Sequence, residues 1–208
     1  MERIREAHDD VEPVLISGNI GPRGDGYVPG ERLSAEEAAE YHSHQIQTFA
    51  DTAADMVTAL TLNYAEEAVG IARAAKAAGM PVVLSFTVET DGRVPSGQSL
   101  GDAIAQVDKA TECYTSYYMI NCAYPTHFED MLAGAGSWRE RVRGVRGNAS
   151  KCSHAELDEA EELDDGNPIE LGEDYGRLKE YKPRLRVYRG CCGTDHRHVG
   201  AIAIACLS

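Results

Sequence analysis

Strand-like segments alternate with helical ones along the whole chain, and this alternation constrains the fold more than any other feature. Six segments have the length of a buried strand, and most of them are nearly continuous apolar runs. They cover residues 13–19, 55–61, 81–88, 117–123, 141–147 and 184–190. Such runs are typical of parallel strands that are covered on both faces. The sequence therefore predicts an α/β fold built from six consecutive strand–helix units.

The helices between these runs begin at recognisable capping residues. A Ser, Thr or Asn followed three residues later by an acidic residue can cap the first turn of a helix. Five such pairs are present: Ser34 with Glu37, Asn63 with Glu66, Ser99 with Asp102, Thr126 with Glu129, and Ser153 with Glu156. A last helix is predicted after Thr194.

Two architectures fit this alternation, a doubly wound open sheet and part of an eight-unit barrel. The glycine-rich segment 18–27, "GNIGPRGDGY", contains a proline and lacks the spacing of a phosphate loop. The pattern alone leaves both architectures open. In either one, functional residues collect where strands end and helices begin, so segment 18–27 is expected to border the site.

The charge balance and the apolar windows exclude two classes of partner. Twenty basic residues against thirty-four acidic ones give a net charge of −14, which repels phosphate backbones and argues against nucleic-acid binding. The most apolar windows are too short to span a bilayer, and the charged first residues are unlike a secretory signal. We expect a soluble, cytoplasmic protein without a membrane partner.

Three of the six cysteines follow predicted strands. Cys122 ends the run "INC", and Cys191 and Cys192 end the run "GCC". Neighbouring side chains of a strand point to opposite faces, so adjacent cysteines can share a ligand only where this alternation breaks. Gly190 and Gly193 provide the backbone freedom for such a break. Three thiolates could therefore converge above the strand ends.

Zinc suits such a set of sulfur atoms. Thiolates bind zinc at roughly 2.3 Å, and catalytic zinc sites keep one of four positions open. A free thiol with a pKa near 8.5 is only about 3% ionised at pH 7, whereas a metal-bound thiol is a thiolate. The cysteines therefore predict a zinc site that activates a thiol from outside. The alternative is that the paired cysteines are incidental.

Four segments carry a resemblance to a known family. "MINCAYPTHF", "RGCCGTDHRHV", "ISGNIGPRGDGY" and "SFTVETDGRVPSGQSLGDAI" resemble the homocysteine S-methyltransferase family, zinc-dependent (β/α)8 barrels that methylate homocysteine to methionine. The resemblance implies an incomplete TIM barrel in which Cys122, Cys191 and Cys192 bind zinc. It also implies homocysteine and a small methyl donor as partners. The donor could be a sulfonium compound, a betaine-like compound or a folate or corrinoid.

Three further residues are assigned to substrate binding. Thr87 and Glu89 end the run 81–88 and could face the pocket and contact the substrate. Asn121 precedes Cys122 and could steady its sulfur through a hydrogen bond.

The chain departs from the family pattern in two places. It opens at the family's third strand, so residues 1–208 are expected to form one homocysteine-binding-type domain that is truncated at its N-terminus. Open sheet edges would then allow self-association. Leu60 stands where the family commonly has a glutamate for the substrate's amino group, and leucine cannot pair with an ammonium. Two functions therefore stay open: a zinc-dependent S-methyltransferase, or a non-catalytic zinc-thiolate protein or inactive truncated relative.

Overall fold

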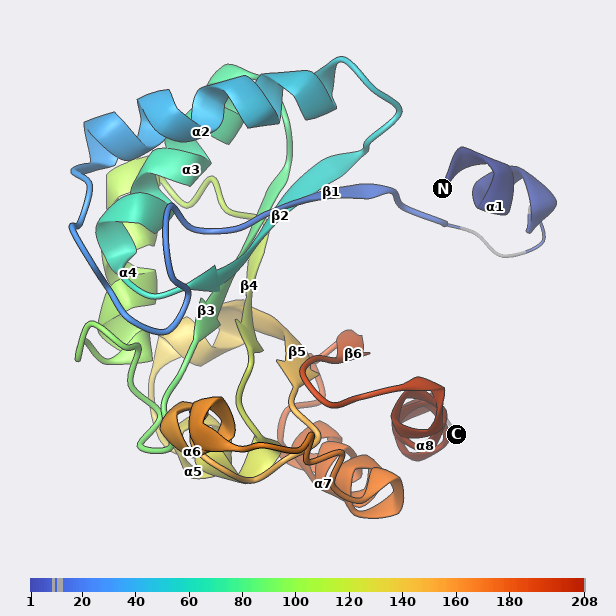
Figure 1. Ribbon diagram of the computed structural model, residues 1–208. Helices are drawn as coiled ribbons and strands as arrows, with labels where there is room; N and C mark the ends of the chain where they lie inside the picture. Colours follow the sequence, from blue (N-terminus) through green and yellow to red (C-terminus); the bar gives the residue numbers. More distant parts are fainter. Residues whose placement is uncertain (9, 11–12, 208) are drawn as a thin grey trace.

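The computed structural model describes residues 1–8, 10 and 13–207, and its centre is one sheet of six parallel strands. The strands are β1 (Ser17–Ile20), β2 (Met56–Leu62), β3 (Val82–Thr87), β4 (Tyr117–Asn121), β5 (Val142–Gly147) and β6 (Val187–Gly190). Each strand pairs with the next one along the chain, and the sheet curls into a half-barrel (Figure 1).

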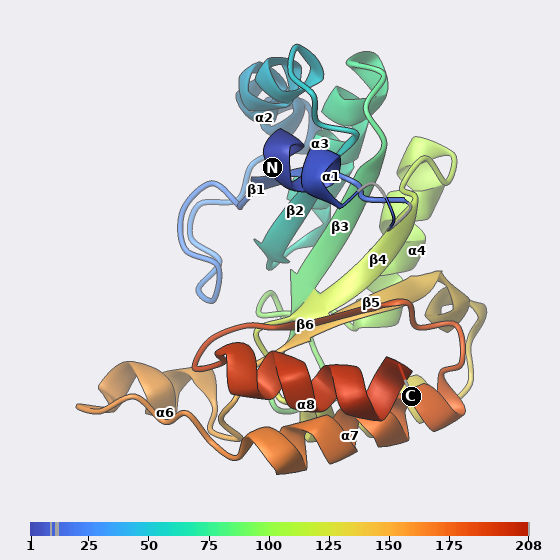
Figure 2. The same cartoon turned by 90° about the vertical axis from the view of Figure 1, so that its right-hand side faces the viewer.

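The order of the strands distinguishes the two architectures. A doubly wound sheet reverses its strand order at a switch point, whereas this sheet keeps the order of the chain from edge to edge. The long helices that follow the strands lie on the convex side, whereas the short N-terminal helix lies on the open, concave side, as Figure 2 shows. The predicted α/β fold, an incomplete TIM barrel with six parallel units, is therefore confirmed.

Helices follow the strands as expected. The α-helices are α1 (Glu2–Ala7), α2 (Ala35–Ala50), α3 (Ala65–Ala77), α4 (Leu100–Thr111), α5 (Glu129–Ala133), α6 (His154–Glu159), α7 (Pro168–Tyr181) and α8 (His196–Leu207). Two short 3-10 helices, η1 (Pro125–His127) and η2 (Ser137–Arg141), connect β4 to β5. No helix among the described residues is long and apolar enough to cross a membrane.

Three of the five predicted caps are confirmed. Ser34 and Ser153 form complete capping boxes with the acidic residues three positions later, and the Ser99 side chain accepts the Asp102 backbone N–H. These caps satisfy backbone donors that the first turn of a helix would otherwise leave without partners.

The caps predicted at Asn63 and Thr126 are wrong. The N-cap of α3 is Tyr64, and the Asn63 amide instead donates to the Asp25 carbonyl oxygen at 2.8 Å. At Thr126, the 3-10 helix η1 precedes α5, whose N-cap is Phe128. In both places a turn at the end of a strand delays the start of the helix.

The outer strands are shorter than their apolar runs. The run 184–190 becomes strand only from Val187, because the Leu185 N–H closes a turn onto the Lys182 carbonyl oxygen. Among the described residues, β1 and β6 each pair with one other strand, so both edges of the sheet are open.

The hydrophobic core fills the space between the convex face of the sheet and the helices. Its fully buried side chains include Ile46, Ile71, Leu84, Tyr118 and Leu178. The concave face is polar by contrast. Ser17 and Thr58 hydroxyl oxygens lie 2.7 Å apart across β1 and β2, and the Ser85 hydroxyl donates to Asn121 at 2.5 Å. The core thus stabilises the sheet from outside and leaves the inner face free for polar chemistry.

Gly70 allows α2 and α3 to pack closely, which gives a testable prediction. A β-carbon at Gly70 would lie 2.5 Å from the Ala38 β-carbon and 2.7 Å from the Ala35 carbonyl oxygen. We expect Gly70→Ala to destabilise the protein by about 1–3 kcal/mol in urea unfolding, despite the better helix propensity of alanine. The matched change is Gly200→Ala in α8, where a β-carbon meets nothing within 4 Å and stability should stay equal or rise. Equal effects of the two changes would contradict the close packing.

Candidate metal centre

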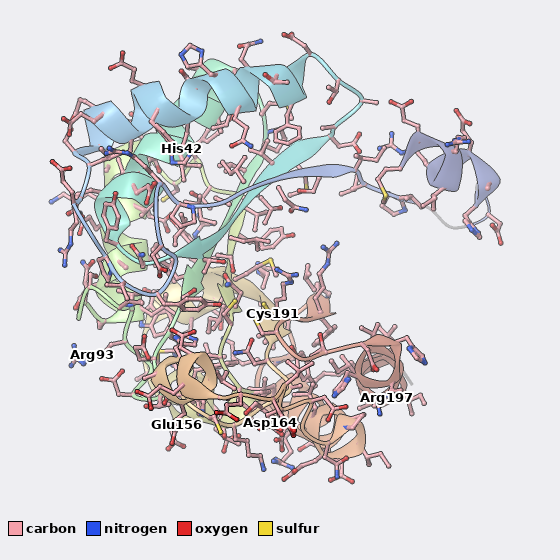
Figure 3. All side chains as sticks on the ribbon, in the orientation of Figure 1. His42, Arg93, Glu156, Asp164, Cys191 and Arg197 are labelled. Carbon is pink, nitrogen blue, oxygen red and sulfur yellow. The ribbon has the colours of Figure 1, made fainter. Side chains whose placement is uncertain are left out.

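Three cysteine sulfurs meet where β4 and β6 end. The Sγ atoms of Cys122 and Cys191 are 3.0 Å apart, and those of Cys122, Cys191 and Cys192 all lie within 4.8 Å of one another. Among the described residues, this is the one group of three potential ligand atoms so close together. Figure 3 shows Cys191 at the open side of the sheet, between its upper and lower halves.

A local change of backbone direction turns Cys122 toward β6. Its φ is 55°, in the left-handed region that residues other than glycine rarely adopt. The Cys122 N–H continues the ladder to β5 by donating to the Arg146 carbonyl oxygen at 3.1 Å. The strand therefore stays paired while the cysteine side chain leaves the strand alternation.

Glycines allow a similar change of backbone direction at the end of β6. A β-carbon at Gly190 would lie 2.2 Å from the Thr194 hydroxyl oxygen, so only glycine fits the turn. Gly193 has a φ of 74°. The Cys191 N–H is held by the Gly147 carbonyl oxygen at 2.7 Å. The expected backbone freedom at the two glycines is confirmed.

The geometry fits a soft metal ion. In a tetrahedral site with zinc–sulfur bonds of about 2.3 Å, neighbouring sulfurs lie roughly 3.8 Å apart. The three sulfurs lie within 4.8 Å of one another, with Cys122 and Cys191 at 3.0 Å, so a bound ion requires that these two move slightly apart. Cys122 is buried, Cys191 is half-buried and Cys192 is exposed, so the group opens to solvent on one side. The three cysteines could hold a metal ion and leave one position free for an outside ligand.

The three thiols influence one another's ionisation. Hydrogen bonds from Cys122 and Cys191 lower the pKa of the Cys192 thiol, whereas hydrogen bonds with Cys122 and Cys192 raise the pKa of Cys191. These hydrogen bonds connect the ionisation of the exposed Cys192 to that of its two neighbours.

Tyr27 and His154 border the cysteines, and sequence reasoning did not identify either residue. The Tyr27 hydroxyl lies 3.8 Å from the Cys192 sulfur, and its ring packs on His154 with centroids 4.2 Å apart. His154 Nε2 hydrogen-bonds with the Cys122 carbonyl oxygen. Burial, aided by a hydrogen bond with Cys122, raises the pKa of the Tyr27 hydroxyl, so it remains a neutral donor. The expectation that segment 18–27 borders the site is confirmed.

The residues predicted to bind substrate lie around the cysteines in different ways. Glu89 Oε1 is 3.3 Å from His154 Nδ1, which links it to the Cys122 main chain. Thr87 is fully buried at the end of β3, and its hydroxyl oxygen lies 3.5 Å from the Asn121 amide nitrogen. Glu89 therefore lies near Cys122 through His154, and Thr87 belongs to the buried contacts around Asn121.

Asn121 connects three strands beneath the cysteines. Its Oδ1 accepts the Thr61 backbone N–H at 3.0 Å and the Ser85 hydroxyl at 2.5 Å, and its Nδ2 donates to the Thr61 hydroxyl at 3.2 Å. Thr61 has a φ of 62°, a strained conformation for a β-branched residue. Asn121 thus holds the irregular end of β2 in place.

A cavity of about 210 Å³ opens beside the exposed cysteine. Its lining includes Leu157, Leu163, Ser150, Asp164 and Cys192. It offers room for a small ligand next to the sulfur that faces solvent.

The fold is shared with a known methyltransferase. The homocysteine methyltransferase MmuM from Escherichia coli aligns in its metallated form with a TM-score of 0.72 at 17% sequence identity, over 98% of this chain and 65% of that chain. Its apo form aligns with a TM-score of 0.70 at 17% identity, over 98% of this chain and 68% of that one. Its oxidised form gives a TM-score of 0.72 at 17% identity, with the same 98% and 65%.

These alignments establish the fold and show what share of the matched chains is covered. At this identity the structural likeness establishes the fold, and the chain spans about two thirds of the length of these structures. Comparison with curated protein sequences gave no match. Residues 1–206 match the family described as Homocysteine S-methyltransferase, and the chain belongs to that family.

Proposed function

We propose that residues 1–208 form one homocysteine-binding-type domain in which Cys122, Cys191 and Cys192 hold a zinc ion. In this proposal the thiol of homocysteine is activated at the site for methylation to methionine. The observation that carries it is the meeting of three sulfurs within 4.8 Å around a position that is open on one side.

The chain's own residues would hold the substrate and align it. Zinc, when bound, would supply the charge that keeps a substrate thiol ionised at neutral pH. The exposed Cys192 leaves a path for the thiol, and the neutral Tyr27 hydroxyl can donate toward the Cys192 sulfur at 3.8 Å. Glu89 would pair with the substrate's amino group, the role that Leu60 cannot take, while Thr87 and Asn121 would fix the floor of the site. Alignment of thiol and methyl donor is then the main contribution of the protein.

A second candidate function is a zinc-thiolate protein that binds metal and thiols without turnover. One observation favours it: the half-buried Leu60 takes the place at which the family commonly has an ammonium-binding glutamate. This candidate uses the same metal site as the first but does not transfer a methyl group.

Formation of methionine separates the two candidates. The zinc-loaded full chain is incubated with homocysteine and, in turn, a sulfonium, a betaine-like and a methylfolate donor, and methionine is measured by mass spectrometry. We expect methionine from at least one donor, lost when zinc is removed by a chelator. The control is Cys113→Ser, which changes an exposed cysteine outside the site and should retain full activity. Zinc and homocysteine binding without methionine from any donor would support the second candidate instead.

A further inference from the structure

Two arginines face each other on the concave side of the sheet. Arg146 on β5 and Arg189 on β6 are direct partners in the parallel register. Their neighbours Val145 and Tyr188 point the other way: Val145 is fully buried in the core, and the Tyr188 ring packs against Tyr175 with centroids 6.3 Å apart. Because side chains alternate along a strand, both arginines project into the half-barrel.

The pair lies next to the main chain that carries the cysteines. Arg146 Nε donates to the Gly190 carbonyl oxygen at 3.0 Å, at the residue that precedes Cys191. The Arg146 carbonyl oxygen accepts the Cys122 N–H at 3.1 Å. Arg146 is therefore tied to the main chain beside both cysteine-bearing strand ends, and Arg189 lies two residues before Cys191.

Neither guanidinium has a carboxylate partner among the described residues. Other arginines of the chain do: Arg141 pairs with Asp108 at 2.8 Å, and Arg197 pairs with Asp165 at 2.7 Å. Like charges directly opposite each other on neighbouring strands repel, so an anion between them would be stabilising. In a chain with fourteen more acidic than basic residues, two adjacent and unpaired arginines indicate a binding site for an anion.

We propose that Arg146 and Arg189 bind the carboxylate of the thiol substrate. This inference rests on the proposed function and adds the group that selects the substrate. The planar guanidinium fork matches a carboxylate in a bidentate manner. A thiol amino acid carries its carboxylate a short carbon chain away from its sulfur, so one molecule can reach both the cysteine group and the arginines. Its amino group then points toward the β3 side, where Glu89 lies.

The first test compares thiols on the unchanged, zinc-loaded full chain by isothermal titration calorimetry. Homocysteine is compared with sulfanylbutanoate, which lacks the amino group, and with aminopropanethiol, which lacks the carboxylate. We expect aminopropanethiol to bind about tenfold or more weakly than homocysteine, because charge-assisted hydrogen bonds to the arginines are lost. Equal affinities of aminopropanethiol and homocysteine would overturn the inference and leave the proposed function intact. If no thiol bound the zinc-loaded chain, both would be overturned.

The second test uses variants of the exposed arginine. We expect Arg189→Gln to weaken homocysteine binding about tenfold and to leave aminopropanethiol binding unchanged, with Arg189→Lys intermediate because it keeps charge without the fork. The matched control, Arg186→Gln, removes the same charge from an exposed arginine next to β6 and should change neither affinity. An anionic methyl donor also carries carboxylates that the two arginines can bind. If Arg189→Gln raised the KM of a methylfolate donor but left homocysteine affinity unchanged, the inference would be overturned in favour of the donor.

Discussion

Replacing Cys191 with serine is expected to abolish zinc binding by this chain. Cys191 lies 3.0 Å from the Cys122 sulfur, within the group that also includes Cys192, and it is half-buried. A serine hydroxyl stays protonated near neutral pH and cannot replace a thiolate ligand. After dialysis, metal analysis should give about one zinc ion per chain for the unchanged protein and less than about a tenth of that for Cys191→Ser.

The control for this change is another cysteine of the same chain. Cys113 is exposed and lies in the turn that follows α4, so Cys113→Ser should retain the full zinc content. A Cys191→Ser protein that kept as much zinc as the control would show that the metal binds elsewhere. Loss of zinc from both variants would point to a general loss of structure.

Replacing Glu67 with alanine is expected to cause the largest loss of stability. The carboxylate of Glu67 is fully buried; it accepts the Arg23 backbone N–H at 2.6 Å and lies 2.9 Å from His42 Nε2. Figure 3 shows His42 where α2 faces the rest of the fold. Removing one member of a buried pair leaves the other without its partner, which costs roughly 3–5 kcal/mol. Urea unfolding should report this loss directly.

Glu67 also connects the core to the site, because Arg23 belongs to the segment that carries Tyr27 over Cys192. Glu67→Gln keeps an acceptor for the Arg23 N–H and should be milder than Glu67→Ala. The control is Glu36→Ala, which removes an exposed carboxylate paired with Arg73 and should leave the unfolding midpoint unchanged. An alanine at position 67 with no more effect than this control would contradict the structural role of the buried pair.

The sequence predicted the units of the fold because their signals are local. An apolar run such as 81–88 reports a strand covered on both faces, and the serine at position 34 or 153 reports the start of a helix. Such signals do not report which strand lies next to which. The strand order, and therefore the half-barrel, depends on tertiary contacts. From the sequence it could be predicted only through the family resemblance.

The cysteines could be predicted for a related reason. Parallel strands end at one edge of the sheet, so Cys122 and the Cys191–Cys192 pair had to come near each other once both were placed at strand ends. The prediction of helix caps failed where a long-range contact determines the local structure. Asn63 has the residue type of an N-cap, yet its amide is taken by the Asp25 carbonyl oxygen, thirty-eight residues away.

The sequence predicted that segment 18–27 borders the site, but it could not show which residue of that segment contacts a cysteine. Tyr27 and Cys192 are 165 residues apart in the sequence, and no sequence motif links the two positions. Arg146 and Arg189 belong to arginine-rich strands, and which arginines face inward depends on register. The pairing of β4 with β5 shifts between Tyr118 and Met119, so the inward residues of β5 could be assigned only once its pairing and the burial of Val145 were known.

X-ray absorption at the zinc edge counts the sulfur atoms around the metal and so examines the three-cysteine site itself. For the zinc-loaded full chain, we expect three sulfurs and one lighter ligand, and four sulfurs once homocysteine is added. Zinc bound by fewer than three sulfurs, or a sulfur count that homocysteine leaves unchanged, would contradict a three-cysteine site that receives a substrate thiol.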